Sequence, residues 1–396
     1  MSLTNFGRDY LLLCLRMNKV IDGFVDAYYG PLELKKIVEQ ENKCSPQQLI
    51  ESCKSLQKQL NEQGLIEERI KFLEKTLGAI KTSLAIITGK EMPYLEEVYK
   101  LYDIKPELID DSKFYDVAEE LNSLYEGSGT LIERINKTKK RRQILPENLE
   151  ETFSHAFRKI REKTIEIMPD VLPEGESISF QLVKDEPWSA YNWYLGNCIS
   201  RIDINTDLPV QWDHVLKLVV HEGYPGHHTE HAVKEKLLYQ DEQRFEHCIL
   251  LIPTPEAVIS EGIGNAAIDV LFKDNEKFKF AFNEFCLDHS SEDLENFIAQ
   301  SKSWEKVRGL LNNVAIHAHV DGWGDDDLVN YAMEFGFFTE KYIRQNLKFI
   351  RHPLWSSYVF TYSFGEMLIK RKFGPNPRPE DFKILLTHPA LPSDIV

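Results

Sequence analysis

The segment DHVLKLVVHEGYPGHHTEH, residues 213–231, joins an apolar helical run to a cluster of histidines. The run 215–220 is typical of a buried helix and leads directly into His221 and Glu222. Neutral imidazoles are zinc ligands, and a carboxylate beside them can act as a general base. The segment therefore predicts a zinc site at the end of a helix.

The spacing of these histidines does not suit a regular helix. In the HExxH arrangement two histidines four residues apart project from one helix face, but here Pro225 stands four residues after His221. His227 would point elsewhere, and His228 would lie about 10 Å further along the axis. Pro225-Gly226 can break the helix, because proline removes a donor and glycine accepts unusual dihedral angles. Two residues could then loop out and bring His227 to the usual place of the second histidine.

A second interpretation needs no loop. Residues 227–231 fit HxxEH, the inverted zinc motif, with His227 and His231 as ligands and Glu230 as base. In either case we expect an acidic third ligand from another element, and Glu261 in VISEGIGNAAIDV (258–270) is the strongest candidate. Asn265, one turn later, could orient a ligating histidine through a hydrogen bond.

The rest of the chain predicts a mainly α protein with one small sheet. Apolar residues recur at three- and four-residue spacing through residues 1–165, which we expect to be an N-terminal helical region. Three short segments rich in β-branched and aromatic residues predict a sheet within 176–207, and the last of them could offer an edge to an extended peptide. Helical patterns return at Trp212. We expect a catalytic region over 166–396, with metal-site helices at 212–275 and further helices to the end, possibly packed with 1–165 as one unit. The three strand segments are ISFQLV (178–183), YNWYLG (191–196) and SRIDINTD (200–207).

Composition excludes several classes of partner. The 396 residues carry 47 Lys and Arg against 63 Asp and Glu, for a net charge of −16, which disfavours nucleic acid and anionic membranes. The six cysteines form no CxxC pair, no signal-peptide cleavage site is visible, and no apolar stretch approaches about 20 residues. We therefore expect a cytoplasmic protein with reduced thiols. The basic run KTKKRR (137–142) lacks aromatic residues and predicts a solvated helix face.

Five segments spread over nearly the whole chain suggest a family. They are GFVDAYYGP (23–31), HEGYPGHH (221–228), EGIGNA (261–266), HVDGW (319–323) and TYSFGEMLI (361–369). Together they resemble the DUF885 family of helical, zincin-like metallopeptidases. Two departures stand out, since Ile263 replaces a common tryptophan and PLWS (353–356) replaces the usual PGQA.

The resemblance implies a gluzincin-type site on a mainly α, zincin-like fold, with a small sheet before the active-site helix. His221 and His227 would bind one zinc ion, with Glu261 as third ligand and His228 in reserve as the second. Glu222 would be the general base that activates water.

Peptide hydrolysis also needs a donor for the developing oxyanion, for which His319, Tyr358 and Tyr362 are candidates. Arg344 and Arg351 could grip a substrate carboxylate with two parallel hydrogen bonds. The leading hypothesis is a zinc-dependent metallopeptidase that acts on short peptides. The alternatives are a metal-dependent amidohydrolase of a non-peptide amide, and a degenerate zincin scaffold that serves as a binding protein.

Overall fold

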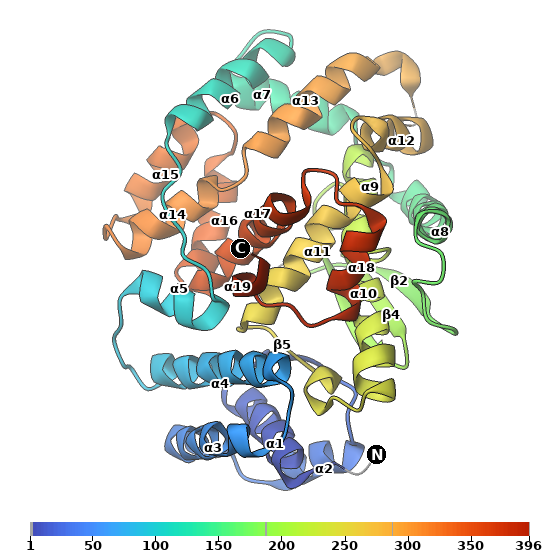
Figure 1. Cartoon of the computed structure of the whole chain (residues 1–396). Helices are drawn as coiled ribbons and strands as arrows, with labels where there is room; N and C mark the ends of the chain where they lie inside the picture. The colour runs from blue at the N-terminus through green and yellow to red at the C-terminus, as the bar shows by residue number, and fades with distance from the viewer. Residues whose placement is uncertain (1–2, 187, 287, 396) are drawn as a thin grey trace.

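The computed structural model describes residues 3–186, 188–286 and 288–395, and these ranges are mainly helical, which confirms the predicted class. Helices α1–α4 form one end of the molecule (Figure 1). Leu73, Leu77, Ile80 and Leu84 show why α4 lies there: their three- and four-residue spacing puts all four on one buried face. The elements of this end are α1 (Asn5–Val20), α2 (Leu32–Gln40), α3 (Pro46–Gln59), η1 (Leu60–Glu62) and α4 (Glu67–Ile87).

The next helices form the far end of the molecule and parts of both of its sides (Figure 1). Most of the basic run 137–142 is exposed, as predicted, but Arg142 at the end of α7 is buried. Its guanidinium donates to Glu292 at 2.9 and 2.7 Å and to Asp213 at 2.8 Å. Arg142 thus ties α7 to the start of α9. These elements are α5 (Tyr94–Tyr102), α6 (Ser112–Leu124), α7 (Leu131–Arg141), η2 (Pro146–Asn148) and α8 (Leu149–Ile167).

A three-stranded sheet follows α8, where the sequence predicts it. It contains β2 (Ser177–Val183), β3 (Ala190–Gly196) and β4 (Ile199–Asn205) in the order β2-β4-β3. β4 pairs with β2 in parallel and with β3 in antiparallel fashion. The expectation that the last segment offers a free edge is wrong, because both edges of β4 are occupied by its neighbours.

A second, two-stranded sheet was not predicted. β1 (Val25–Tyr28) pairs antiparallel with β5 (Ile249–Leu251). Both strands are too short to show an alternating pattern in the sequence. Their pairing brings the segment GFVDAYYGP next to the metal-site helices.

Helix α11 (Pro255–Leu271) runs through the middle of the molecule beside α17 (Thr361–Phe373) (Figure 1). The two helices cross at Gly262 and Gly365, where a Cβ on Gly365 would lie 1.9 Å from the carbonyl oxygen of Val258. Only glycine allows so close a crossing. It places the start of α17 against the middle of α11, where the site forms.

The remaining helices cover α11 and α17. The large hydrophobic cluster around them includes Phe153 as well as Val215, so the regions on either side of residue 165 share one core. No helix in the described ranges has the length and apolarity to cross a membrane. The other elements are α9 (Trp212–Glu222), α10 (His227–Lys234), the π-helical turn η3 (Glu235–Asp241), η4 (Phe245–Cys248), α12 (Glu276–Phe285), η5 (His289–Ser291), α13 (Leu294–Lys306), α14 (Leu310–His319), α15 (Asp325–Glu334), α16 (Glu340–Ile350), η6 (Ser356–Phe360), α18 (Pro379–Thr387) and α19 (Pro392–Ile395).

Candidate metal centre

The helix breaks between the two histidines as the spacing requires. α9 ends at Glu222 and α10 begins at His227. Across the break the amide of Gly226 donates to the carbonyl of Val220 at 3.1 Å, six residues back instead of the usual four. Two residues therefore loop out, and the rings of His221 and His227 come together with their centroids 4.6 Å apart.

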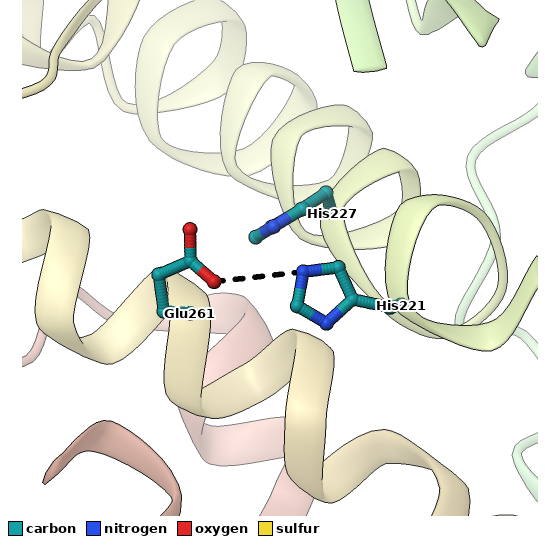
Figure 2. Close-up of side chains that lie close together, drawn as sticks. All are labelled: His221, His227 and Glu261. Atoms are coloured by element: carbon teal, nitrogen blue, oxygen red, sulfur yellow. Dashed lines mark ion pairs between the residues drawn. The ribbon is translucent and has the colours of Figure 1, made fainter. Parts of the chain in front are cut away.

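Glu261 of α11 completes a group of three possible metal ligands (Figure 2). One ligand atom from each of His221, His227 and Glu261 lies within 4.8 Å of the other two, and His221 Nε2 lies 3.5 Å from Glu261 Oε2. Tetrahedral zinc with bonds of about 2.1 Å holds its ligand atoms about 3.4 Å apart. The group is thus close to the geometry that zinc needs.

The surroundings of this group suit a cation. Glu261 Oε2 is buried and has no hydrogen-bond partner among the described residues, which is costly unless something positive satisfies it. Burial lowers the pKa of His227, but three neighbouring carboxylates, Glu230, Glu261 and Glu222, outweigh it and raise the pKa to about 9. The same negative potential would attract a metal ion.

Hydrogen bonds orient His227. Its Nδ1 lies 3.1 Å from Ser260 Oγ, and that hydroxyl donates to Glu230 Oε2 at 2.6 Å. The other oxygen of Glu230 accepts from Lys234 Nζ at 2.6 Å. Nδ1 can therefore donate its hydrogen to Ser260, which leaves the Nε2 lone pair for a metal.

α11 and the segment before α17 orient the other two ligands. Burial lowers the pKa of His221, and the side chain of Asn265, which the sequence suggested as its partner, opposes this shift. A Cβ on Gly264 would lie 2.8 Å from the His221 ring, so the missing side chain makes room for the imidazole. Tyr358 donates to Glu261 Oε1 at 2.9 Å. Tyr358 thus contacts a ligand, whereas the sequence suggested it as the oxyanion donor.

Glu222 lies beside the group at the end of α9. Burial raises the pKa of Glu222 to about 7; His227 opposes this shift, while Glu261 and Asp26 add to it. The backbone carbonyl of Glu222 accepts from Asn192 Nδ2 at 2.6 Å, which ties the helix end to β3. A carboxyl group in this setting can both accept and release a proton near neutral pH.

Tyr362 of α17 lies next to Tyr358, with ring centroids 5.4 Å apart, and is 49% exposed. Desolvation by the surrounding protein, then Glu261 and Glu222, raise the pKa of Tyr362. No described residue hydrogen-bonds to that hydroxyl, because the contact from Asn265 goes to the backbone carbonyl. The Tyr362 hydroxyl is therefore neutral and available to a substrate.

His228 is not brought into the group. Its Nδ1 lies 2.8 Å from Ser200 Oγ and its Nε2 lies 3.0 Å from Glu176 Oε2. Both ring nitrogens are thus used to fix α10 to the sheet. The structure also bears on the HxxEH interpretation. His231 does lie within ligand distance of His227 and Glu230. However, both oxygens of Glu230 already accept hydrogen bonds, so Glu230 is not available as a base.

Three other candidates lie elsewhere. His319 stacks on Tyr94 at 4.3 Å and its Nε2 lies 2.7 Å from the carbonyl of Ile350. Arg344 and Arg351 are held by α15, where their guanidinium groups donate to Asp326 at 2.8 Å and Asp325 at 3.0 Å. An acidic chain offers many such local partners, so neither arginine is free to grip a substrate.

Sequence reasoning missed Asp26 and Tyr191. Asp26 lies on β1 and accepts a hydrogen bond from the Tyr191 hydroxyl of β3. Its charge acts on Glu222 and Glu261. For Asp26, the sequence contains one signal: it lies in GFVDAYYGP, one of the five segments that resemble DUF885. No chemical pattern in that segment indicated a role for it.

Replacement of Ser260 tests the hydrogen bonds behind His227. In Ser260→Ala the imidazole loses its acceptor, so we expect zinc affinity to fall by about 10–100-fold. The measurement is competition with a chromogenic chelator. Ser301→Ala, which removes a helix-surface hydroxyl that donates to the Phe297 carbonyl, is the matched control. Equal affinities for both variants and wild type would contradict the role of Ser260.

Comparison with known proteins supports the mainly helical fold, but it supports no family, activity or site. No family model matches the chain, and no curated protein matches it. A solved structure described as "the putative lipoprotein from Colwellia psychrerythraea" is similar, with a TM-score of 0.54 and 14% sequence identity, over 93% of this chain and 69% of that chain. The chain therefore shares its overall helical architecture with that protein, and the resemblance to DUF885 stays a prediction.

Proposed function

We propose that the protein is a zinc-dependent peptidase that acts on short peptides, built on a zincin-like helical scaffold. His221, His227 and Glu261 would hold one zinc ion. The observation that carries the proposal is the buried Oε2 of Glu261, which has no hydrogen-bond partner among the described residues and lies beside two imidazoles, with the carboxyl group of Glu222 next to them.

Each residue has a distinct task in hydrolysis of an amide. A bound zinc ion would polarise the carbonyl group and acidify water. Glu222 takes a proton from the attacking water and returns it to the leaving amine nitrogen. The hydroxyl of Tyr362 donates a hydrogen bond to the oxygen that gains negative charge. Tyr358 and Asn265 keep Glu261 and His221 in position.

Tyr362→Phe tests the oxyanion donor. Loss of one such donor costs about 10²–10³ in kcat, with KM little changed, because the bond forms mainly in the transition state. Steady-state kinetics on a cleaved peptide measure both parameters. Tyr342→Phe is the control, since Tyr342 is also an exposed tyrosine but lies on α16. If Tyr362→Phe retains wild-type kcat, Tyr362 is not the donor.

The function itself is tested by metal analysis and a peptide digest. We expect one zinc ion per chain by elemental mass spectrometry. We also expect cleavage of short members of a synthetic peptide mixture, lost with a chelator and restored by zinc. Cleavage that persists after complete zinc removal, or a zinc-loaded protein that cleaves none of the peptides, contradicts the proposal. Hydrolysis of non-peptide amides alone would favour an amidohydrolase.

A further inference from the structure

An exposed lysine precedes the proposed zinc site by one helical turn. His214, Lys217 and His221 share a face of α9, at intervals of three and four residues. His214 and Lys217 are exposed, in contrast to their buried neighbours on the helix. Lys217 has no ion pair or hydrogen bond with any residue in the described ranges, and its charge acts on His221. It is therefore a cation without a partner in those ranges, one helical turn before the proposed ligand His221.

Three more cations surround Lys217, from α12, from the loop before α14 and from α17. All three are neutralised by three carboxylates. The pairs are Lys277 with Asp269 and Glu305, Arg308 with Glu366, and Lys370 with Asp269 and Glu366. Among these four cations, Lys217 is thus the one without an ion-pair partner in the described ranges.

The charged groups that act most strongly on Lys217 are three cations and one anion, Glu305. Although the side chain reaches solvent, desolvation by the protein around it and then the charge of Arg308 lower the pKa of Lys217 to about 7, against the opposing charge of Glu305. A negative group placed there would restore the full charge of the ammonium. Because Lys217 alone of the four cations lacks an ion-pair partner in the described ranges, a singly charged anion such as a carboxylate matches better than a phosphate dianion.

We propose that Lys217 binds the terminal carboxylate of the peptide substrate, so that the enzyme cleaves close to a free carboxyl end. This inference rests on the proposed peptidase function. One helical turn separates Lys217 from His221, about 6 Å along the axis. An extended peptide covers about 3.5 Å per residue. The carboxylate therefore lies one or two residues from the bond that is cut. Lys217 replaces Arg344 and Arg351, which the sequence suggested for this task.

Matched substrates test the inference. An N-acetylated tripeptide with a free carboxyl end and its carboxyl-terminal amide differ only in the group that Lys217 would bind. We expect the wild type to prefer the acid through KM. Lys217→Met should raise KM for the acid by about 10-fold or more and leave the amide unchanged. Lys217→Arg should keep the preference, and Lys54→Met, an exposed and unpaired lysine of α3, should behave as wild type.

A binding measurement separates this inference from the proposed function. Saturation-transfer NMR compares N-acetylalanine with its amide on the zinc-free wild type and on Lys217→Met. If the acid binds the wild type alone but no peptide is cleaved, the carboxylate site stands and the peptidase fails. If acid and amide peptides are cleaved alike and Lys217→Met changes neither, the peptidase stands and the carboxylate site is overturned. Absence of acid-specific binding together with unselective cleavage overturns it as well.

Discussion

Glu222→Gln is expected to lose hydrolytic activity by about 10²–10⁴-fold while it still binds one zinc ion per chain. The amide cannot take a proton from water, and general acid–base catalysis contributes a factor of this size. Zinc remains because Glu222 is not one of the three grouped ligand residues. The measurement is kcat/KM on a cleaved peptide together with metal content of the same sample.

Two further variants serve as controls for Glu222→Gln. His221→Ala removes a proposed ligand, so we expect it to lose zinc and activity together. Glu151→Gln removes an exposed carboxylate of α8 and should match the wild type in both. If Glu222→Gln cleaves peptides at the wild-type rate, Glu222 is not the base and another group must move the proton.

Gly226→Ala is expected to cost about 3 kcal/mol or more of unfolding free energy and to abolish zinc binding. A Cβ at this position would lie 2.0 Å from the carbonyl oxygen of His221 and 2.3 Å from that of Val220. The backbone of the loop between α9 and α10 must then open, which separates His221 from His227. Denaturant titration and zinc binding measure the two effects.

Gly78→Ala is the matched control for this glycine. Gly78 lies inside α4, and a Cβ there would meet nothing within 4 Å. Alanine in an open helix position stabilises by roughly 0.5–1 kcal/mol. A Gly226→Ala variant that is as stable as Gly78→Ala and binds zinc would show that the loop tolerates a side chain.

The sequence predicted the backbone of segment 213–231 well, because the constraints on this segment come from residues close together along the chain. Pro225 four residues after His221 excluded a regular HExxH helix, and the bonds from Gly226 to Val220 and from Thr229 to Gly223 show the two-residue loop that was expected. The sequence also indicated Glu261, but it predicted this residue at the start of a helix, whereas α11 already begins at Pro255. The sheet at 177–205 followed from composition and turn residues.

The sequence predicted less wherever contacts join distant segments. Three residues with suitable chemistry contact other side chains in the fold: His319 stacks on Tyr94, Arg344 binds Asp326, and Arg351 binds Asp325. Ser260 and Asp26 had no motif to mark them.

Helical periodicity, turn residues and the spacing of histidines determined the class of fold and the identity of the candidate ligands, because each depends on residues close together along the chain. The tertiary structure alone placed His227 and not His228 in the group of candidate ligands, with Ser260 opposite the ring of His227 and Glu176 opposite that of His228. It also decided that Lys217 has no ion-pair partner within the described ranges, because the charges around it come from α11, α12, α13 and α17 and from the loop before α14. Pairing among such distant charges depends on distances that only the packed helices set.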